Sequence, residues 1–511
     1  MEMKKSEISV NKLAAELSSS VIVECDTIVP DSKPDLLKIL QLDADAKLLS
    51  RELSNGRLTL TGRVDYKILY VPDSATGVSS LTASAPFTHT EENDAIRDSM
   101  YSDAKVDVEH IEFNLINSRK LSIKSVVAAQ GTVTDKLTLS IPRDIEGENV
   151  EIRKKSFQTL SRVLQKDEEI SLEEQLILPP GKATIGSLLK NDVSIRNKDV
   201  KVINNKVVAK GEVVICSLYL PESGDSVTFV EHSIPFTEIL DAEGIQEEYF
   251  NTVDFIVKDS SFNLSPDPDG DLRVIDASLK LGVSITADQV VSADAVTDAY
   301  STACNLTVTS SYFEVEEMAE NIHSAATVKE NLQPIDGIPP ITHVYNVVAK
   351  PYVTSAVADG NKITVEGTID TYILYISSKE DSPVYNFKAD VPFTVHIEAA
   401  NVTPDSKIRA KLDVSHISYN MNAAGEIELR VVLDNDITIY KTVGIDVISN
   451  LEQEDFSDQD TPSIVLYFVQ KNDTLWDIAK RYHTKTAYIE ELNDLQEGRL
   501  EEGCQLLIPK S

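Results

Sequence analysis

The run SPDPDGD at residues 265–271 places three aspartates at alternate positions. Carboxylates at such spacing are oxygen ligands of the kind that calcium prefers. An EF-hand loop, however, closes with a bidentate glutamate, and no glutamate stands at that position here. Aspartate, proline and glycine are also ordinary turn residues. We therefore interpret the run as the tip of a hairpin and expect no metal site there.

Signatures of catalysis are missing from the rest of the sequence. It contains no GxxxxGK[ST] phosphate loop, no GxSxG nucleophile elbow and no HExxH zinc motif. The eight histidines are dispersed, and acidic pairs are so frequent that none stands out. We therefore expect no catalytic residues, no cofactor and no enzyme activity.

The charge and cysteine content exclude several classes of partner. The chain has 83 acidic and 48 basic residues, a net charge of −35, which disfavours nucleic acid and anionic membranes as partners. The four cysteines are scattered without a CxxC pair, as expected of reduced thiols. The first 20 residues lack the apolar core of a signal peptide, and no run of about 18 apolar residues occurs. We expect neither export nor membrane insertion.

A period of two organises residues 57–70, RLTLTGRVDYKILY. Leu58, Leu60, Val64 and every second residue onward fall on one face, which is the pattern of a half-buried β-strand. The pattern returns at residues 206–219 and 362–375. Each copy has a glycine in mid-strand and a tyrosine eight residues later. The glycine predicts a bend or the close approach of another chain segment.

Further marks keep the same register and predict three domain-sized repeats. A Pro-Phe-Thr triplet follows each glycine by 24 or 25 residues, and the copies are offset by about 149 and then 156 or 157 residues. We predict six segments: an N-terminal segment at 1–20, repeats at 21–150, 165–310 and 320–450, an acidic linker at 451–462, and a C-terminal domain at 463–511.

Each repeat is expected to be mainly β. In repeat 1, residues 106–115 and 120–127 read as two strands around a turn, and little helix is indicated beyond a short one around residues 10–17. We predict three antiparallel β-sandwich or barrel-like domains. The proline-containing segment IVPDSKPD at residues 28–35 sets an extended entry into the repeat.

The last 49 residues change character. Residues 464–470 predict a strand, Thr474 caps a helix whose apolar positions include Leu475 and Ile478, and a second helix lies around residues 487–493. Residues 503–509 return as a strand. The predicted order is therefore β-α-α-β.

This C-terminal stretch resembles the LysM domain. The matching residues are YFVQ at 467–470, DTLW at 473–476, Ile478, Ala479, Tyr482, Asn493 and GCQLLIP at 503–509. Asn472 stands where the family usually has glycine, and asparagine also tolerates the left-handed conformation.

The LysM resemblance implies binding of N-acetylglucosamine polymers in a shallow groove between two loops. The implied partner-binding residues are Asn472, Asp473, Thr474, Trp476, Asn493, Asp494, Leu495 and Gln496. For Trp476 two roles stay open, because it lies one residue off the core stripe: exposed anchor for a partner, or packing within the small domain.

The three repeats with their IVPDSKPD entry, followed by LysM, resemble the SipL-like spore coat morphogenetic proteins of clostridia, whose repeats are called SPOCS domains. The resemblance implies a scaffold in the mother-cell cytoplasm that helps the coat assemble on the forespore. Its LysM domain is expected to bind the coat ATPase, stage IV sporulation protein A, beside contacts with other coat proteins. Two other classes stay open: an exported protein that binds peptidoglycan of the wall or cortex, and a LysM-bearing hydrolase.

Overall fold

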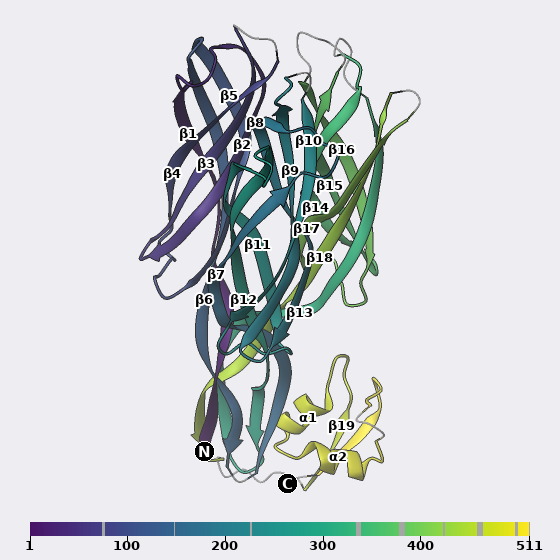
Figure 1. The fold of residues 1–511 in the computed structure, drawn as a ribbon. Helices are drawn as coiled ribbons and strands as arrows, with labels where there is room; N and C mark the ends of the chain where they lie inside the picture. Colours follow the sequence, from purple (N-terminus) through teal and green to yellow (C-terminus); the bar gives the residue numbers. More distant parts are fainter. Residues whose placement is uncertain are drawn as a thin grey trace.

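The chain is built almost entirely from antiparallel strands, as the computed structural model in Figure 1 shows. The structure describes residues 1–73, 77–147, 149–224, 227–333, 339–377, 384–422, 425–456, 463–495 and 499–509. Two short helices occur in these residues, both in the small C-terminal domain. The prediction of a mainly β protein with a small α+β end is therefore confirmed.

Each repeat contains six strands in the same order. In repeat 1 they are β1 (Glu2–Ile28), β2 (Leu36–Ser54), β3 (Arg57–Pro72), β4 (Ser79–Glu92), β5 (Tyr101–Asn117) and β6 (Lys120–Glu146). In repeat 2 they are β7 (Val150–Ile177), β8 (Ile185–Ile203), β9 (Lys206–Pro221), β10 (Thr228–Asp241), β11 (Phe250–Pro266) and β12 (Leu272–Ser301). In repeat 3 they are β13 (Asn305–Leu332), β14 (His343–Asp359), β15 (Lys362–Ile376), β16 (Val384–Glu398), β17 (Lys407–Met421) and β18 (Ile427–Glu454).

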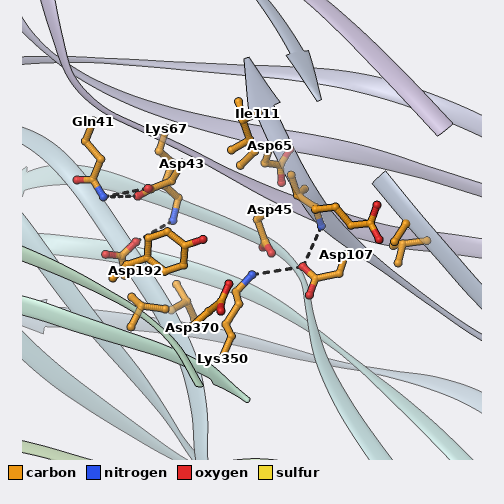
Figure 2. A pocket seen from close by; sticks show the side chains of 18 of the residues that line it. Gln41, Asp43, Asp45, Asp65, Lys67, Asp107, Ile111, Asp192, Lys350 and Asp370 are labelled. Carbon is orange, nitrogen blue, oxygen red and sulfur yellow. Dashed lines mark hydrogen bonds and ion pairs between the residues drawn. The ribbon is translucent and has the colours of Figure 1, made fainter. Parts of the chain in front are cut away.

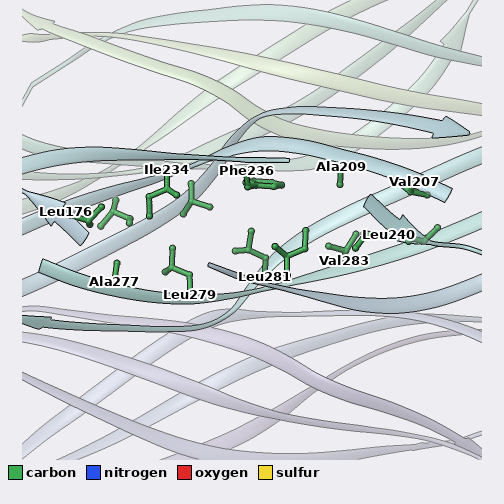
Figure 3. Packing of buried hydrophobic residues seen from close by; sticks show 14 of the residues in the cluster. Leu176, Val207, Ala209, Ile234, Phe236, Leu240, Ala277, Leu279, Leu281 and Val283 are labelled. Atoms are coloured by element: carbon green, nitrogen blue, oxygen red, sulfur yellow. The ribbon is translucent and has the colours of Figure 1, made fainter. Parts of the chain in front are cut away.

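Two three-stranded sheets form the sandwich of each repeat. The strand orders are β1-β6-β5 and β2-β3-β4 in repeat 1, β11-β12-β7 and β10-β9-β8 in repeat 2, and β13-β18-β17 and β14-β15-β16 in repeat 3. In repeat 2, Leu279 and Leu281 from one sheet face Phe236 from the other across a buried core (Figure 3). The period-two pattern of the sequence therefore marks the face that each strand turns to this core.

The mid-strand glycine makes room for the phenylalanine of the Pro-Phe-Thr triplet. Gly62 in β3 pairs with Phe87 in β4, and a Cβ atom at Gly62 would collide with the Phe87 ring and with the carbonyl oxygen of Lys47. The same pairing recurs between Gly211 and Phe236 and between Gly367 and Phe393. The two motifs are thus the two sides of one contact, and this contact requires glycine.

The tyrosine that ends each repeated strand holds the entry segment of its repeat. The Tyr70 hydroxyl donates to the carbonyl oxygen of Pro34 at 2.9 Å, 36 residues earlier in the chain. The equivalent bonds run from Tyr219 to Ala183 at 3.1 Å and from Tyr375 to Pro339 at 2.9 Å. Because a proline-rich segment cannot continue a sheet ladder, this hydrogen bond fixes where the segment lies.

Equivalent leucines join the three repeats along a common axis. Leu69, Leu218 and Leu374 stand one residue before the repeated tyrosines, and they are almost completely buried in one cluster. The cluster also contains Val78, Leu189, Cys216, Val227, Tyr345 and Val384. A single repeat would expose its share of this surface, so burial along the axis depends on all three.

A second shared core lies in what we call the stalk, three two-stranded ribbons that extend beyond the sandwiches (Figure 1). The ribbons pair residues 2–13 with 134–146, 150–162 with 288–301, and 305–318 with 440–454. Val10, Phe157 and Ile445, one from each ribbon, belong to one buried cluster. The three separate domain-sized repeats stay a prediction, and the two cores that the repeats share favour one joint folding unit.

The helix predicted around residues 10–17 is wrong, because these residues lie in β1 and pair with β6. The register shifts between Leu13 and Ala15, which makes Ala14 the extra residue of a β-bulge. The bulge moves the buried set from one parity to the other, so no single period of two runs through the segment. The sequence pattern therefore concealed the strand.

The acidic stretch at 451–462, predicted to be a linker, begins inside a strand, because β18 continues to Glu454. Residues 457–462 of this stretch lie outside the described residues. The predicted boundaries between the repeats stay predictions. The paired strands themselves span residues 2–146, 150–301 and 305–454.

We predict that Leu218→Ala destabilises the whole chain by about 2–5 kcal/mol, because it leaves a cavity where three repeats meet. The measurement is chemical denaturation of the full chain. Ile239→Ala is the matched control, since Ile239 is 62% exposed on the neighbouring strand and its loss should cost less than about 0.5 kcal/mol. Equal effects of the two substitutions would contradict a shared core.

Candidate binding site in the C-terminal domain

The C-terminal domain has the predicted order: β19 (Ile464–Phe468), α1 (Leu475–Arg481), α2 (Thr486–Leu492) and β20 (Gln505–Pro509). The two strands pair antiparallel. Five almost completely buried side chains form its core: Ile478, Ala479, Ile489, Leu506 and Ile508. The domain therefore has a small apolar core of its own.

The first predicted loop is shaped by its own hydrogen bonds. Asn472 has a φ of 69°, the left-handed conformation predicted for it. Asp473 accepts hydrogen bonds from the Tyr467 hydroxyl at 2.6 Å and the Gln470 backbone N–H at 2.7 Å, and the first of these holds the pKa of Asp473 below its usual value. Thr474 caps α1 by accepting a hydrogen bond from its first turn. Asn472 and Thr474 are exposed, so a ligand can reach this loop.

The second predicted loop is tied to β20. The Asn493 side chain accepts a hydrogen bond from the Leu507 backbone N–H at 2.7 Å and donates to the Leu507 carbonyl at 2.7 Å. Asn493 is therefore a clamp between α2 and β20. Asp494 is exposed with a φ of 51°, Leu495 packs against the core, and Gln496 lies outside the described residues.

Trp476 lies against the end of β12 in repeat 2. Its indole N–H donates to Asp298 at 2.7 Å, and its ring packs edge to face with Tyr300 at a centroid distance of 4.9 Å. The guanidinium of Arg153 lies 5.6 Å from the ring centroid. Trp476 is therefore partly buried between the two domains, and in this arrangement it is not a freely exposed anchor.

Asp298 is the electrostatic centre of this contact. It also accepts a hydrogen bond from the Lys480 ammonium at 2.6 Å. Burial alone would raise the pKa of Asp298, but the hydrogen bonds from Lys480 and Trp476 and the charge of Lys480 hold it below its usual value. Because its pKa is lowered, the ionised Asp298 carboxylate stabilises the contact at neutral pH, and this stabilisation is lost as the pH falls through that pKa.

Tyr300 completes the contact from the side of repeat 2. Its hydroxyl donates to the backbone carbonyl of Thr484 at 2.9 Å, and its ring belongs to the core cluster of the C-terminal domain. Burial and the charge of Glu151 raise the pKa of Tyr300, so the hydroxyl keeps its proton as a donor. Glu151 itself lies 3.9 Å from the Lys485 ammonium.

The outer face of the β19–β20 sheet is apolar and exposed. Leu466 and Leu507 stand opposite each other in the register, which places them on one face with Ile464 and Phe468. These four side chains are between 40% and 55% exposed. We call this surface the apolar face, and its size relative to so small a domain is typical of a contact surface for another protein.

A second candidate site is a charged cavity of about 750 Å³ where the three repeats meet. Figure 2 shows carboxylates and lysines from different repeats around it, among them Asp107 of repeat 1 and Lys350 of repeat 3. The Asp107 carboxylate accepts a hydrogen bond from the Tyr352 hydroxyl at 2.8 Å and lies 3.4 Å from the Lys350 ammonium. Ion pairs between repeats therefore line this space.

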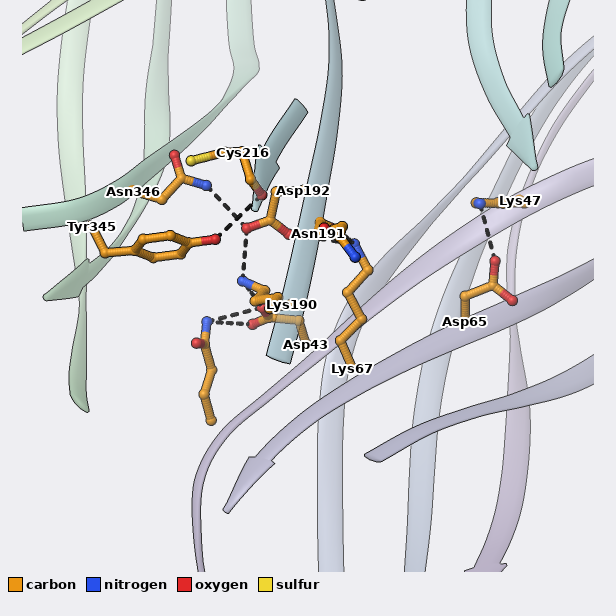
Figure 4. Close-up of polar contacts among 11 residues, drawn as sticks. Asp43, Lys47, Asp65, Lys67, Lys190, Asn191, Asp192, Cys216, Tyr345 and Asn346 are labelled. Atoms are coloured by element: carbon orange, nitrogen blue, oxygen red, sulfur yellow. Dashed lines mark hydrogen bonds and ion pairs between the residues drawn. The ribbon is translucent and has the colours of Figure 1, made fainter. Parts of the chain in front are cut away.

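A network of polar contacts among residues that line the cavity is shown in Figure 4. The Lys190 ammonium lies 2.6 Å from Asp43 of repeat 1 and 3.0 Å from Asp192 of its own repeat. Asn346 of repeat 3 donates to Asp192 at 3.0 Å, and Gln41 donates to Asp43 at 2.9 Å. Gln41, Lys190 and Asn346 occupy the same position in the three repeats, so the network links equivalent donors of all three repeats through Asp43 and Asp192.

The network has the character of a structural junction. Burial alone would lower the pKa of Lys190, but the charges of Asp192 and Asp43 raise it above its usual value, so the ammonium stays charged. Over the described residues, no group of three or more His, Cys, Asp or Glu side chains is arranged to hold a metal ion. The run at 265–271 is a turn, in which the Asp267 carboxylate accepts from the backbone N–H groups of Asp269 and Asp271.

Comparison with protein families connects these sites to a known architecture. A family model described as SipL, SPOCS domain matches residues 35–116, 184–265 and 340–422, and the LysM domain model matches residues 467–509. The chain belongs to the SipL-like family. Each SPOCS match in this SipL-like protein spans four consecutive strands, β2 to β5 in repeat 1, and leaves the long stalk strands outside. No curated protein and no solved structure matches the chain.

The family assigns the coarse function. SPOCS and LysM are non-catalytic binding domains, and their combination identifies a sporulation protein associated with the spore coat and with the potential to bind peptidoglycan. Within the described part of the chain, no helix is long and apolar enough to cross a membrane.

The contact residues Asp298 and Tyr300 were missed by sequence reasoning. They stand 178 and 176 residues before Trp476, and nothing in their local pattern distinguishes them from other strand residues. Lys480, one turn after Trp476 on α1, was the only local signal, because residues four apart share a helix face.

We predict that Lys190→Met destabilises the chain by about 3–5 kcal/mol, since it removes the buried cation between the half-buried Asp43 and Asp192 and leaves only Lys67, 3.3 Å from Asp192, as a counter-charge. The matched control is Lys388→Met. Lys388 also bridges two aspartates, Asp370 and Asp390, but on the surface, where its loss should cost less than about 1 kcal/mol. Denaturant titration measures both, and a loss at Lys190 as small as that at Lys388 would show that the junction is not stabilised by this network.

For Asn493→Ala we expect the LysM domain to lose about 1–3 kcal/mol of stability, because the clamp to β20 is removed. Fluorescence of Trp476, the only tryptophan in the chain, follows unfolding of this domain on heating. Glu491→Ala, an exposed change on the same helix, is the control. If the melting curve of Asn493→Ala is unchanged, the clamp does not stabilise the domain, and only the predicted ligand-binding role of Asn493 is left.

Proposed function

We propose that this SipL-like protein is a non-enzymatic scaffold that helps the spore coat assemble at the forespore surface in the mother cell. Its LysM domain binds the ATPase of the coat base, stage IV sporulation protein A, and the repeats contact other coat proteins. The binding surface comprises the apolar face and the residues predicted from sequence: Asn472, Asp473, Thr474, Trp476, Asn493, Asp494, Leu495 and Gln496.

The exposed apolar face is the observation that favours a protein as the partner. A groove for a sugar polymer needs polar groups in loops, whereas Leu466, Phe468 and their two neighbours offer a flat apolar strand surface. Aromatic and aliphatic side chains at the centre of such a surface supply most of the binding energy of protein interfaces. The family background of spore coat association then favours a coat protein as the partner.

A second candidate, binding of N-acetylglucosamine polymers in peptidoglycan, is favoured by a different observation. Asn472, Thr474 and Asp494 of the two predicted loops are exposed, so the groove of the LysM fold is open to a ligand. Sedimentation of the full chain with purified sacculi tests this candidate. Retention that N-acetylglucosamine oligomers compete away would support it.

The test of the protein partner is a titration of the full chain with purified coat-base ATPase. We predict that the double substitution Leu466→Ser and Phe468→Ser weakens binding about 30-fold, the equivalent of a hot-spot loss of about 2 kcal/mol. Ile239→Ser is the matched control, since Ile239 is an apolar residue of repeat 2 that is 62% exposed, and this variant should bind like the wild type. Circular dichroism confirms that each variant is folded.

Two results would contradict the proposal. Unchanged affinity of the double variant would exclude the apolar face, and no binding of the wild-type chain would exclude this ATPase as the partner. Retention by sacculi without any ATPase binding would support the peptidoglycan candidate instead.

A further inference from the structure

The end of β12 forms a cradle for one side of the LysM domain. Asp298 accepts hydrogen bonds from Trp476 and Lys480, and Tyr300 is 2% exposed under the same domain. The contact therefore occupies the tryptophan side of LysM, while Asn472, Thr474 and the apolar face remain exposed.

Repeat 2 alone has the residues for this cradle. A β-bulge precedes Asp298 in its ribbon, and the same bulge precedes Asp144 in repeat 1 and Asn450 in repeat 3. Two residues further on, where repeat 2 has Tyr300, the other repeats have Glu146 and Glu452. An aromatic residue and a half-buried carboxylate thus occur together at one of three equivalent places, as expected of a site with its own role.

The contact can also be separated from the fold of each part. The LysM core is formed by side chains from its own strands and helices, with Tyr300 added at the edge. On the other side, Asp298 and Tyr300 hold Trp476 and Thr484, and further contacts come from Arg153 over the Trp476 ring, the Ser301 carbonyl at His483, Glu151 near Lys485 and Phe456 against His483. Since Phe456 and Ser463 are separated by six residues, 457–462, a released LysM domain would stay at high local concentration near the cradle.

We propose that the end of β12 binds the tryptophan side of LysM in competition with the coat-base ATPase, so that Trp476 reaches this partner only when LysM leaves the cradle. The inference rests on the proposed function. The apolar face and the loops stay accessible in the closed arrangement, and Trp476 adds to the binding surface in the open one. Because only the open fraction offers Trp476, the closed arrangement binds the partner through the apolar face and the loops alone, and therefore more weakly.

The two arrangements can be followed with the only tryptophan of the chain. Acrylamide quenching of the full chain reports how accessible Trp476 is, without any ligand. Asp298→Ala should raise the quenching constant and shift the emission to longer wavelength. Lys480→Gln weakens the cradle from the LysM side and should act in the same direction. Asp144→Ala, at the equivalent place in repeat 1, is the matched control and should behave like the wild type.

The same proteins are then titrated with purified coat-base ATPase. Asp298→Ala raises the open fraction, so it should bind the ATPase more tightly, by about tenfold for a wild-type open fraction of about a tenth. Adding Trp476→Ala to Asp298→Ala should remove that gain. Binding of N-acetylglucosamine oligomers, which uses loops that are exposed in both arrangements, should differ by less than about twofold between wild type and Asp298→Ala.

The outcomes separate the inference from the proposed function. If quenching is unchanged in both Asp298→Ala and Lys480→Gln, the cradle does not control access to Trp476, and the inference is wrong. Greater quenching with unchanged or weaker ATPase affinity overturns the competition, although the partner itself is retained. No ATPase binding by any variant, including Asp298→Ala, overturns the proposed function and the competition with it.

Discussion

Side chains of all three repeats must be buried against one another, and the rest of the structure depends on this constraint. Leu69, Leu218 and Leu374 meet in one buried cluster, and Gln41, Lys190 and Asn346 pair with these leucines on the neighbouring strands. The leucines supply apolar burial that tolerates several arrangements. The buried Lys190, by contrast, needs Asp43 and Asp192 at defined places, and we interpret it as the element that selects one arrangement of the repeats.

In the stalk, too, side chains of all three repeats are buried against one another, and one end of the stalk holds the LysM domain. Its three ribbons share a core, so the end of β12 is held in place by the two neighbouring ribbons. Asp298 and Tyr300 at that end position the LysM domain beside the stalk (Figure 1). In this arrangement the apolar face of the LysM domain stays exposed, while its tryptophan side is held against the stalk.

The repeated features of the fold were predictable from the sequence, because the residues that form each contact lie close together in the chain. Gly62 with Phe87, and the equivalent pairs, leave a strong pattern because each contact lies within one hairpin. The strand at residues 10–17 was mistaken for a helix because the bulge at Ala14 breaks its alternation. The loop positions of LysM were predicted from resemblance, but the surroundings of Trp476 were not, since Asp298 lies 178 residues away in sequence. Contacts between the repeats leave no local pattern in the sequence. Gln41, Lys190 and Asn346 occupy equivalent positions, yet their residue types and their partners differ.

The central claim is that three repeats form one cooperative body. Native-state hydrogen exchange of the full chain, read at the amides of the central strands β3, β9 and β15, tests it most directly. The shared cores predict that the slowest amides of all three strands open with one common free energy, and that Leu218→Ala lowers the three values together. Three distinct opening free energies, with only the value of β9 lowered by Leu218→Ala, would contradict the account and describe three independent domains on one chain.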